Sequence, residues 1–138
     1  MDSVVIDTSV WIEAFRPKGD PVLADTVKRL IKTGHILVPG IIKAELLRGT
    51  KTQAEFDHLK TLLEALPCLP MRESFWDDVA AFSFTLLRQG LTVPLVDATI
   101  ALLCIQNNTV LLHRDRHFDL IAGVTALKVI TGVKAHEF

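Results

Sequence analysis

The segment Ser3–Ser9, with the sequence SVVIDTS, sets the architecture of the chain. It begins with a short apolar run, typical of a buried strand, and this run ends at Asp7. Thr8 and Ser9 then offer hydroxyls that can cap a helix, and Trp11 lies within that helix. The segment therefore predicts a strand that passes directly into a helix, with a carboxylate at the junction.

The rest of the chain repeats this alternation of short apolar strands and amphipathic helices. We expect strands at residues 3–6, 36–38, 68–71, 109–112 and 127–130. We expect a first helix through Phe15, and further helices at 22–33, 41–48, 53–66, 73–88, 95–106 and 118–122. Strands that are apolar throughout are typical of parallel sheets covered on both faces. The pattern predicts one α/β domain, residues 1–138: an α/β/α sandwich with a short, mostly parallel central sheet of about five strands surrounded by helices.

Composition narrows the class of protein. The chain has 138 residues, 49% hydrophobic and 22% charged, which is typical of a globular domain. Its formal net charge of −1 excludes the overall basic character of many nucleic-acid-binding proteins, but not a local basic patch. We find no signal-peptide pattern and no apolar stretch long enough to span a membrane, and expect a cytoplasmic protein. Cys68 and Cys104 have apolar neighbours, so we expect buried inert thiols rather than a disulfide or metal ligands.

Two acidic residues follow predicted strands directly. Asp7 and Asp115 stand at these strand ends, and in parallel α/β sheets ligands bind outside the carboxyl ends of strands. Carboxylates brought to this edge by separate strands can share a ligand. Taken alone, Asp7 could equally be a turn or helix-cap residue.

Two further acidic residues interrupt apolar helix faces. Glu45 shares a face with Ile41 and Ile42, and its simplest alternative role is a surface ion pair with Arg48. Asp97 lies in the most apolar helix of the chain, near its first turn, where capping of free amides is the alternative. A common cation site would explain all four acids.

A cluster of four acids favours a divalent-metal site and metal-assisted phosphodiester hydrolysis. Buried carboxylates without partners are costly, so a cluster of them requires a cation. Oxygen ligands without a cysteine or paired-histidine signature favour Mg²⁺ or Mn²⁺ over zinc. Such ions assist phosphodiester hydrolysis, because they polarise a phosphoryl oxygen and generate hydroxide from bound water.

The chain resembles a PIN domain, and most closely the VapC-type toxins of toxin–antitoxin pairs. The resemblance covers essentially the whole chain and rests on an ordered set of segments, none of which is specific alone. These segments are VIDTS (5–9), AELLRG (44–49), PLVDATIA (94–101) and LLHRDRHF (111–118).

This resemblance implies a PIN-like α/β/α sandwich and a Mg²⁺- or Mn²⁺-dependent endoribonuclease, the toxin of a type II toxin–antitoxin pair. It also implies a homodimer that a cognate antitoxin inhibits. The implied catalytic and metal-binding residues are the four acids, Asp7, Glu45, Asp97 and Asp115. Thr8 or Ser9 would be the small hydroxyl residue that supports them.

The chain departs from the family pattern near its fourth acid. His117 stands where many relatives carry an aspartate, and His113 replaces a common threonine or asparagine, which leaves Asp115 as the sole fourth acid. We interpret His117 as a surface histidine, with contact to substrate phosphate as the alternative. Asp119 either assists the site or lies on a helix surface.

An RNA substrate requires cations around an acidic pocket. Basic residues near the acids in sequence are the predicted RNA-binding residues, although each could be a solvated charge: Arg16, Lys18, Arg48, Arg114 and Arg116. Large apolar residues could form a dimer surface or an antitoxin groove, or else pack in the core: Trp11, Phe15, Phe56 and Trp76.

Other functions fit the pattern less well. A phosphoryl-accepting signalling domain needs a lysine at a strand end opposite the acids, and no lysine fits there. A phosphatase of the haloacid dehalogenase type needs Asp-x-Asp after its first strand, whereas Thr8 and Ser9 follow Asp7. One alternative stays open: a catalytically silent binding module whose acidic pocket receives a basic side chain of a partner.

Overall fold

A computed structural model describes residues 3–131 of the chain. Its sheet has four parallel strands in the order β2-β1-β3-β4. The strands are β1 (Val4–Ile6), β2 (Ile36–Leu37), β3 (Val110–His113) and β4 (Lys128–Thr131). The predicted α/β fold with a parallel sheet is confirmed.

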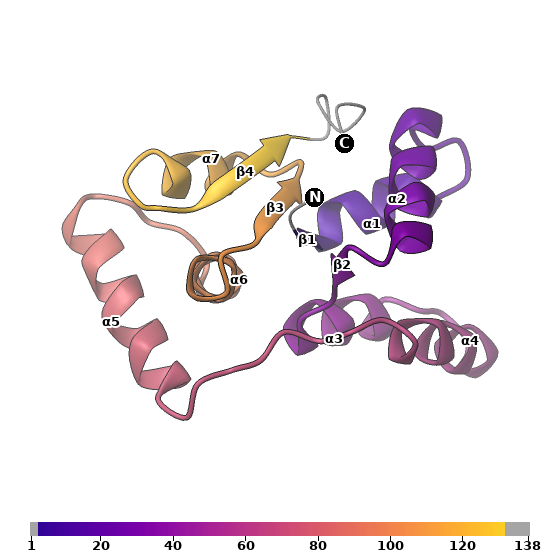
Figure 1. Cartoon of the computed structure of the whole chain (residues 1–138), viewed down its shortest axis with the longest axis horizontal. Helices are drawn as coiled ribbons and strands as arrows, with labels where there is room; N and C mark the ends of the chain where they lie inside the picture. Colours follow the sequence, from indigo (N-terminus) through magenta and orange to yellow (C-terminus); the bar gives the residue numbers. More distant parts are fainter. Residues whose placement is uncertain (1–2, 132–138) are drawn as a thin grey trace.

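Helices surround this sheet. They are α1 (Thr8–Phe15), α2 (Pro21–Thr33), α3 (Gly40–Arg48), α4 (Gln53–Glu64), α5 (Phe75–Arg88), α6 (Leu95–Gln106) and α7 (Arg116–Ala122). In Figure 1, α1 and α2 lie to the right of the sheet, α3 and α4 below it, and α5 and α6 to the left, while α7 lies along β4. None of the helices within residues 3–131 is both long and apolar enough to cross a membrane.

The expected number of strands is wrong by one. Residues 68–71, predicted as the third strand, form no strand, so the sheet has four strands rather than about five. Just before this segment, the Pro67 carbonyl accepts a hydrogen bond from the amide of Val38, the residue after β2, at 2.9 Å. Pro67 precedes the segment and Pro70 lies within it, and because proline has no amide hydrogen, both positions lack a donor for a strand ladder.

Helix α6 is central, as its nearly unbroken apolar surface predicts. Every residue from Ala98 to Cys104 is buried. Burial raises the pKa of the Cys104 thiol to about 12, which fits the prediction of an inert thiol. The prediction is wrong for Cys68, which is exposed because it lies in the extended segment outside the sheet.

The order of the strands determines where a ligand can bind. From β1 the chain moves outward to β2 and then returns to β3 on the other side of β1. The order in which strands are added to the sheet therefore reverses between the parallel strands β1 and β3, and in such sheets ligands bind outside the carboxyl ends of the strands at this point. Asp7 directly follows β1, and Asp115 lies two residues beyond the end of β3.

Candidate metal centre

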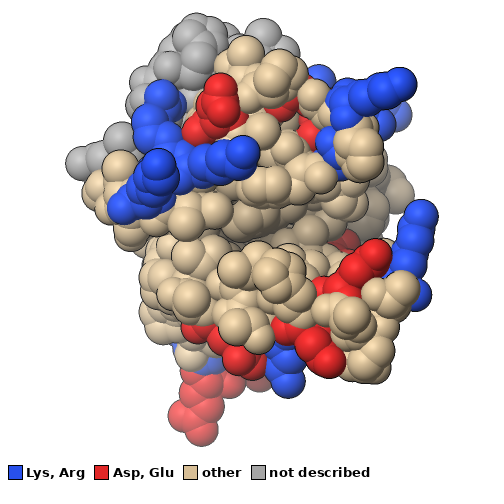
Figure 2. Space-filling model, turned by 90° about the vertical axis from the view of Figure 1, so that its right-hand side faces the viewer, with Lys and Arg blue, Asp and Glu red and all other residues tan. Residues whose placement is uncertain are grey.

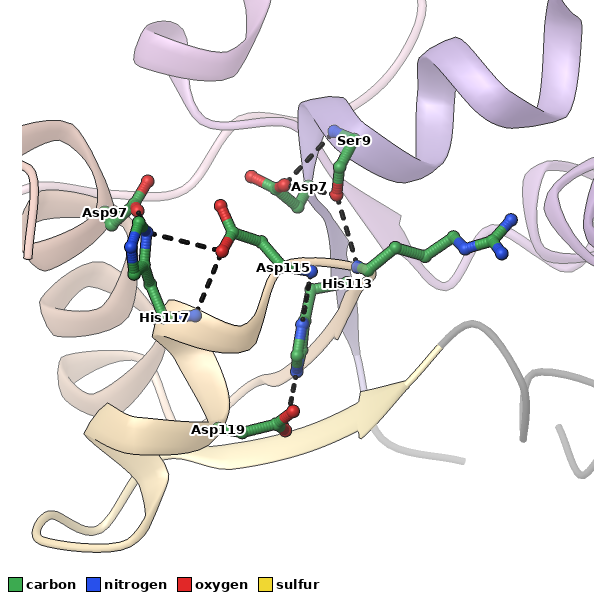
Figure 3. Close-up of polar contacts among 8 residues, drawn as sticks. Asp7, Ser9, Asp97, His113, Asp115, His117 and Asp119 are labelled. Atoms are coloured by element: carbon green, nitrogen blue, oxygen red, sulfur yellow. Dashed lines mark hydrogen bonds and ion pairs between the residues drawn. The ribbon is translucent and has the colours of Figure 1, made fainter.

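Three carboxylates meet where three helices begin. Asp7 is the N-cap of α1, Asp115 is the N-cap of α7, and Asp97 lies in the first turn of α6. Figure 3 shows their carboxylates facing a common space. Free amides at helix N-termini favour negative charge, which helps the fold hold the acids together.

Asp7 caps helix α1, as the alternative reading of its position predicted. The cap uses only one of its two carboxylate oxygens. Its Oδ2 accepts hydrogen bonds from the Ser9 amide at 3.1 Å and the Ser9 hydroxyl at 2.6 Å. The Ser9 Oγ in turn accepts from the Arg114 amide at 3.2 Å, which ties the start of α1 to the end of β3. Asp7 is only 6% exposed, and its second oxygen stays available to a ligand.

Glu45 reaches the start of α1 from α3. The Thr8 hydroxyl donates to Glu45 Oε1 at 2.9 Å, so the half-buried carboxylate lies beside the residue that follows Asp7. The surface ion pair with Arg48 does not form within residues 3–131. Thr8 and Ser9 thus divide the supporting contacts, one to Glu45 and the other to Asp7.

Asp97, Asp115 and His117 form the tightest cluster of ligating atoms. His117 Nδ1 lies 2.9 Å from Asp97 Oδ2 and 3.3 Å from Asp115 Oδ1, and one ligand atom from each residue falls within 4.8 Å of the others. Asp7 and Glu45 are not members of this group. The interpretation of His117 as a surface histidine is wrong, because its ring is 30% exposed and contacts both acids. Its position two residues after Asp115, where the family resemblance implies a further acid, was the signal that could have revealed this.

The ionised form of Asp97 is disfavoured by its surroundings. Burial raises the pKa of its carboxyl group, and the negative charges of Asp115 and Asp7 raise it further. The hydrogen bond and charge of His117 lower it, but the raised direction prevails. A bound cation would lower the pKa of Asp97 again, since a positive charge favours the ionised carboxylate.

His113 supports the site from behind. It is 1% exposed, and its Nδ1 accepts a hydrogen bond from the Asp115 amide at 3.1 Å. Its Nε2 lies 3.2 Å from Asp119 Oδ1, so Asp119 faces His113, as Figure 3 shows. Its ring also packs against Phe118, with centroids 5.3 Å apart. The sequence alone did not indicate this supporting role of His113.

The five predicted RNA-binding cations differ in their surroundings. Arg16 pairs with Glu13 at 2.9 Å, and Arg114 approaches the same carboxylate at 3.6 Å. The sequence reasoning did not single out Glu13. The remaining cations are exposed and form no ion pair within the described part of the chain: Lys18, Arg48 and Arg116.

An apolar groove lies among the first four helices. It has a volume of about 520 Å³, and its lining comes mostly from apolar side chains of α1, α2, α3 and α4. Figure 2 shows this side of the molecule, with a largely uncharged surface hollowed across its middle. Leu46, next to Glu45, lines the groove, as do Trp11 and Phe15, whose rings stack 5.9 Å apart. The other two predicted aromatics, Phe56 and Trp76, lie outside this lining.

The donor set suits a divalent cation. Carboxylate oxygens are the preferred ligands of Mg²⁺ and Mn²⁺, and imidazole nitrogen binds most first-row divalent metals. The residues that could hold an ion are therefore Asp7, Asp97, Asp115 and His117, with Glu45 next to them across Thr8.

Comparison with known proteins gives a consistent set of matches. Residues 4–124 match the family described as PIN domain. A Mycobacterium bovis protein named VapC ribonuclease Mb1587 is 33% identical over 129 residues, covering 91% of this chain and 96% of that protein. The Mycobacterium tuberculosis protein named Ribonuclease VapC11 matches to the same extent.

Solved structures share the fold at low sequence identity. A chain of FitAB bound to a DNA fragment superposes with a TM-score of 0.75 at 19% identity, covering 94% of each chain. A chain of Rickettsia felis VapBC2, bound to a promoter DNA fragment, gives a TM-score of 0.73 at 18% identity, covering 93% of this chain and 97% of that chain.

Proposed function

The chain belongs to the PIN domain family, and we propose that it is a metal-dependent endoribonuclease, the toxin of a type II toxin–antitoxin pair. The observation that carries this proposal is the meeting of Asp7, Asp97 and Asp115 at three helix N-termini on the edge of the sheet where strand order reverses. Ribonuclease names among relatives 33% identical support RNA as the substrate. A cytoplasmic location stays a prediction.

Mg²⁺ or Mn²⁺ bound at this site would act as a Lewis acid on the phosphodiester and lower the pKa of a water molecule. Asp7 would hold the ion through the oxygen that its helix cap leaves unused, and Asp97 and Asp115 would bind it through their carboxylates beside His117. Glu45, fixed by the Thr8 hydroxyl, would orient the attacking water or accept its proton. Ser9 would keep the Asp7 carboxylate in place.

We propose that the exposed cations guide RNA to this site. Arg48 lies one helical turn after Glu45, and Arg114 and Arg116 flank Asp115 in the chain. Neutralising Arg114 or Arg16 should weaken RNA binding and reduce its dependence on salt, although both contact Glu13. A salt dependence equal to that of the unaltered protein would contradict this assignment.

The apolar groove is the proposed antitoxin site. Ile12, Phe15 and Leu62 line it and are 57%, 50% and 54% exposed, a density of apolar surface that fits an amphipathic helix of a partner. Toxin–antitoxin complexes among the solved structures that share the fold are consistent with such a partner. Because Leu46 adjoins Glu45, a segment bound in the groove could continue toward the acids.

We propose that α5 contributes to a homodimer. Trp76, Phe84 and Leu87 on this helix are 60%, 63% and 56% exposed, and Leu95 at the start of α6 is 60% exposed. Apolar groups this exposed are typical of a protein–protein interface. Sedimentation of the unaltered protein and of a Phe84→Glu variant would test the assignment, and an unchanged molecular mass would contradict it.

The central experiment uses purified protein without a partner and a mixture of structured RNAs, with Mg²⁺, Mn²⁺ or a chelator. We expect metal-dependent cleavage that Asp97→Asn abolishes while the fold survives. Asp25→Asn, at an exposed position on α2, is the matched control and should cleave normally. Cleavage that persists in Asp97→Asn would overturn the site. Absence of cleavage of any RNA would favour the alternative function, a binding module whose acidic pocket receives a basic side chain.

A further inference from the structure

His117 differs in kind from the acids around it. Its ring nitrogen Nδ1 lies 2.9 Å from Asp97 Oδ2 and 3.3 Å from Asp115 Oδ1. Neighbouring ligands of an octahedral Mg²⁺ ion, bound at about 2.1 Å, are about 3.0 Å apart. The two separations from Nδ1 are therefore close to those of ligands that share one cation, and one ligand atom from each of the three residues lies within 4.8 Å of the others.

The backbone fixes the position of this imidazole. The His117 amide donates to Asp115 Oδ1 at 2.9 Å, within the cap of α7. The residue before it, Arg116, is exposed, and the residue after it, Phe118, is fully buried. Between an exposed and a buried neighbour, the half-buried His117 side chain extends toward Asp97, as Figure 3 shows.

A cation could take the place of the contact between His117 and Asp97. The 2.9 Å separation between Nδ1 and the Asp97 oxygen is that of a hydrogen bond. A cation bound to both atoms would replace this hydrogen bond with two coordination bonds.

We infer that His117 is a direct ligand of the bound cation through Nδ1, and that it biases the site toward Mn²⁺ over Mg²⁺. This inference rests on the proposed metal site. A ring nitrogen is a softer ligand than a carboxylate oxygen, and it lacks the negative charge that Mg²⁺ prefers. A site with imidazole should therefore retain Mn²⁺ and lose affinity for Mg²⁺ relative to an all-carboxylate site.

The test is electron spin echo spectroscopy of the full-length protein loaded with Mn²⁺ alone. Coordinated imidazole gives modulation from the ¹⁴N nucleus, so we expect this signal in the unaltered protein. His117→Asp should bind Mn²⁺ without the signal, because an aspartate supplies only oxygen. His58→Asp, at an exposed position on α4, is the control and should retain the signal.

Each outcome of this test is decisive. Mn²⁺ bound without nitrogen modulation would overturn the inference and leave the proposed metal site intact. Modulation that persists in His117→Asp would also overturn it, since another histidine would be the source. Failure of the unaltered protein to bind Mn²⁺ at all would overturn the proposed metal site together with the inference.

Calorimetric titration with Mg²⁺ and Mn²⁺ gives a second readout that needs no catalysis. The ratio of Mn²⁺ to Mg²⁺ affinity should fall in His117→Asp, because the substitution replaces the nitrogen ligand with a carboxylate oxygen. An unchanged ratio would contradict the selectivity part of the inference. Circular dichroism of each variant establishes that it is folded.

Discussion

Asp97→Asn should have opposite effects on stability with and without metal. Without metal, the ionised Asp97 is destabilising, because burial and the charges of Asp115 and Asp7 raise its pKa. Asparagine removes the charge and can still accept the hydrogen bond from His117. We therefore expect the variant to be more stable than the unaltered protein in chelator, and to gain far less from added cation.

The expected gain in stability follows from the distance between Asp97 and Asp115. Like unit charges 4.8 Å apart, the bound on the Asp97–Asp115 ligand atoms, repel by about 3 kcal/mol at an effective dielectric constant of ~20. Because Asp115 is 36% exposed and His117 adjoins both acids, solvent and counter-charge reduce this to about 1 kcal/mol. Unfolding entropy of ~2.1 cal/mol/K per residue over 138 residues converts this to a Tm increase of about 3 °C.

Bound metal should stabilise the unaltered protein by more than this. A cation at ~100 times its Kd adds about 2.7 kcal/mol, which corresponds to about 9 °C on the same scale. Thermal unfolding followed by circular dichroism, in chelator and in Mn²⁺, measures both effects. Asp25→Asn is the control. The reasoning would be refuted if Asp97→Asn melted lower than the unaltered protein in chelator, or if both gained equally from Mn²⁺.

The pH dependence of this difference has a fixed sign. Below pH 3.8, the ordinary pKa of an aspartate, the Asp97 carboxyl is protonated in both the folded and the unfolded chain, so its ionisation contributes nothing to stability. As pH rises past 3.8, the unfolded chain loses the proton first, and stability falls until the raised folded pKa is passed. The advantage of Asp97→Asn in chelator should therefore be present at neutral pH and shrink as pH falls toward 3.8.

Three further predictions test the surroundings of the site. Thr8→Val removes the hydroxyl that binds Glu45 and should lower the rate of metal-dependent RNA cleavage about 10–100-fold, whereas Thr8→Ser should retain it; equal rates would contradict the role of Thr8. A thiol reagent should label exposed Cys68 quickly and buried Cys104 only on unfolding, by mass spectrometry; two fast labels would contradict the packing of α6. Leu62→Glu places a charge in the groove and should abolish binding of an apolar antitoxin-type helix in a pull-down while RNA cleavage persists.

Local pattern was sufficient to predict all the helices and four of the five strands. Helix α6 matches its predicted range at both ends, because its sequence is apolar on every face and is bounded by Pro94 and Asn107. The other helices differ from prediction by one or two residues at their ends, where caps rather than periodicity decide. The strand at 68–71 failed because apolar character alone does not supply the amides that Pro67 and Pro70 lack.

The sequence by itself determined the α/β class, the strand-to-helix junction at Asp7 and the positions of the four acids, since each depends on residues close together in the chain. Only the tertiary structure decided which residue each acid contacts. Glu45 binds the Thr8 hydroxyl, whereas Asp97 and Asp115 cluster with His117. It also showed that His117 contacts Asp97 within the site and that Asp119 lies beside His113. These contacts join α6, β3 and α7, and no local pattern specifies the direction in which a side chain crosses between elements. Their geometry arises only when the whole core has packed.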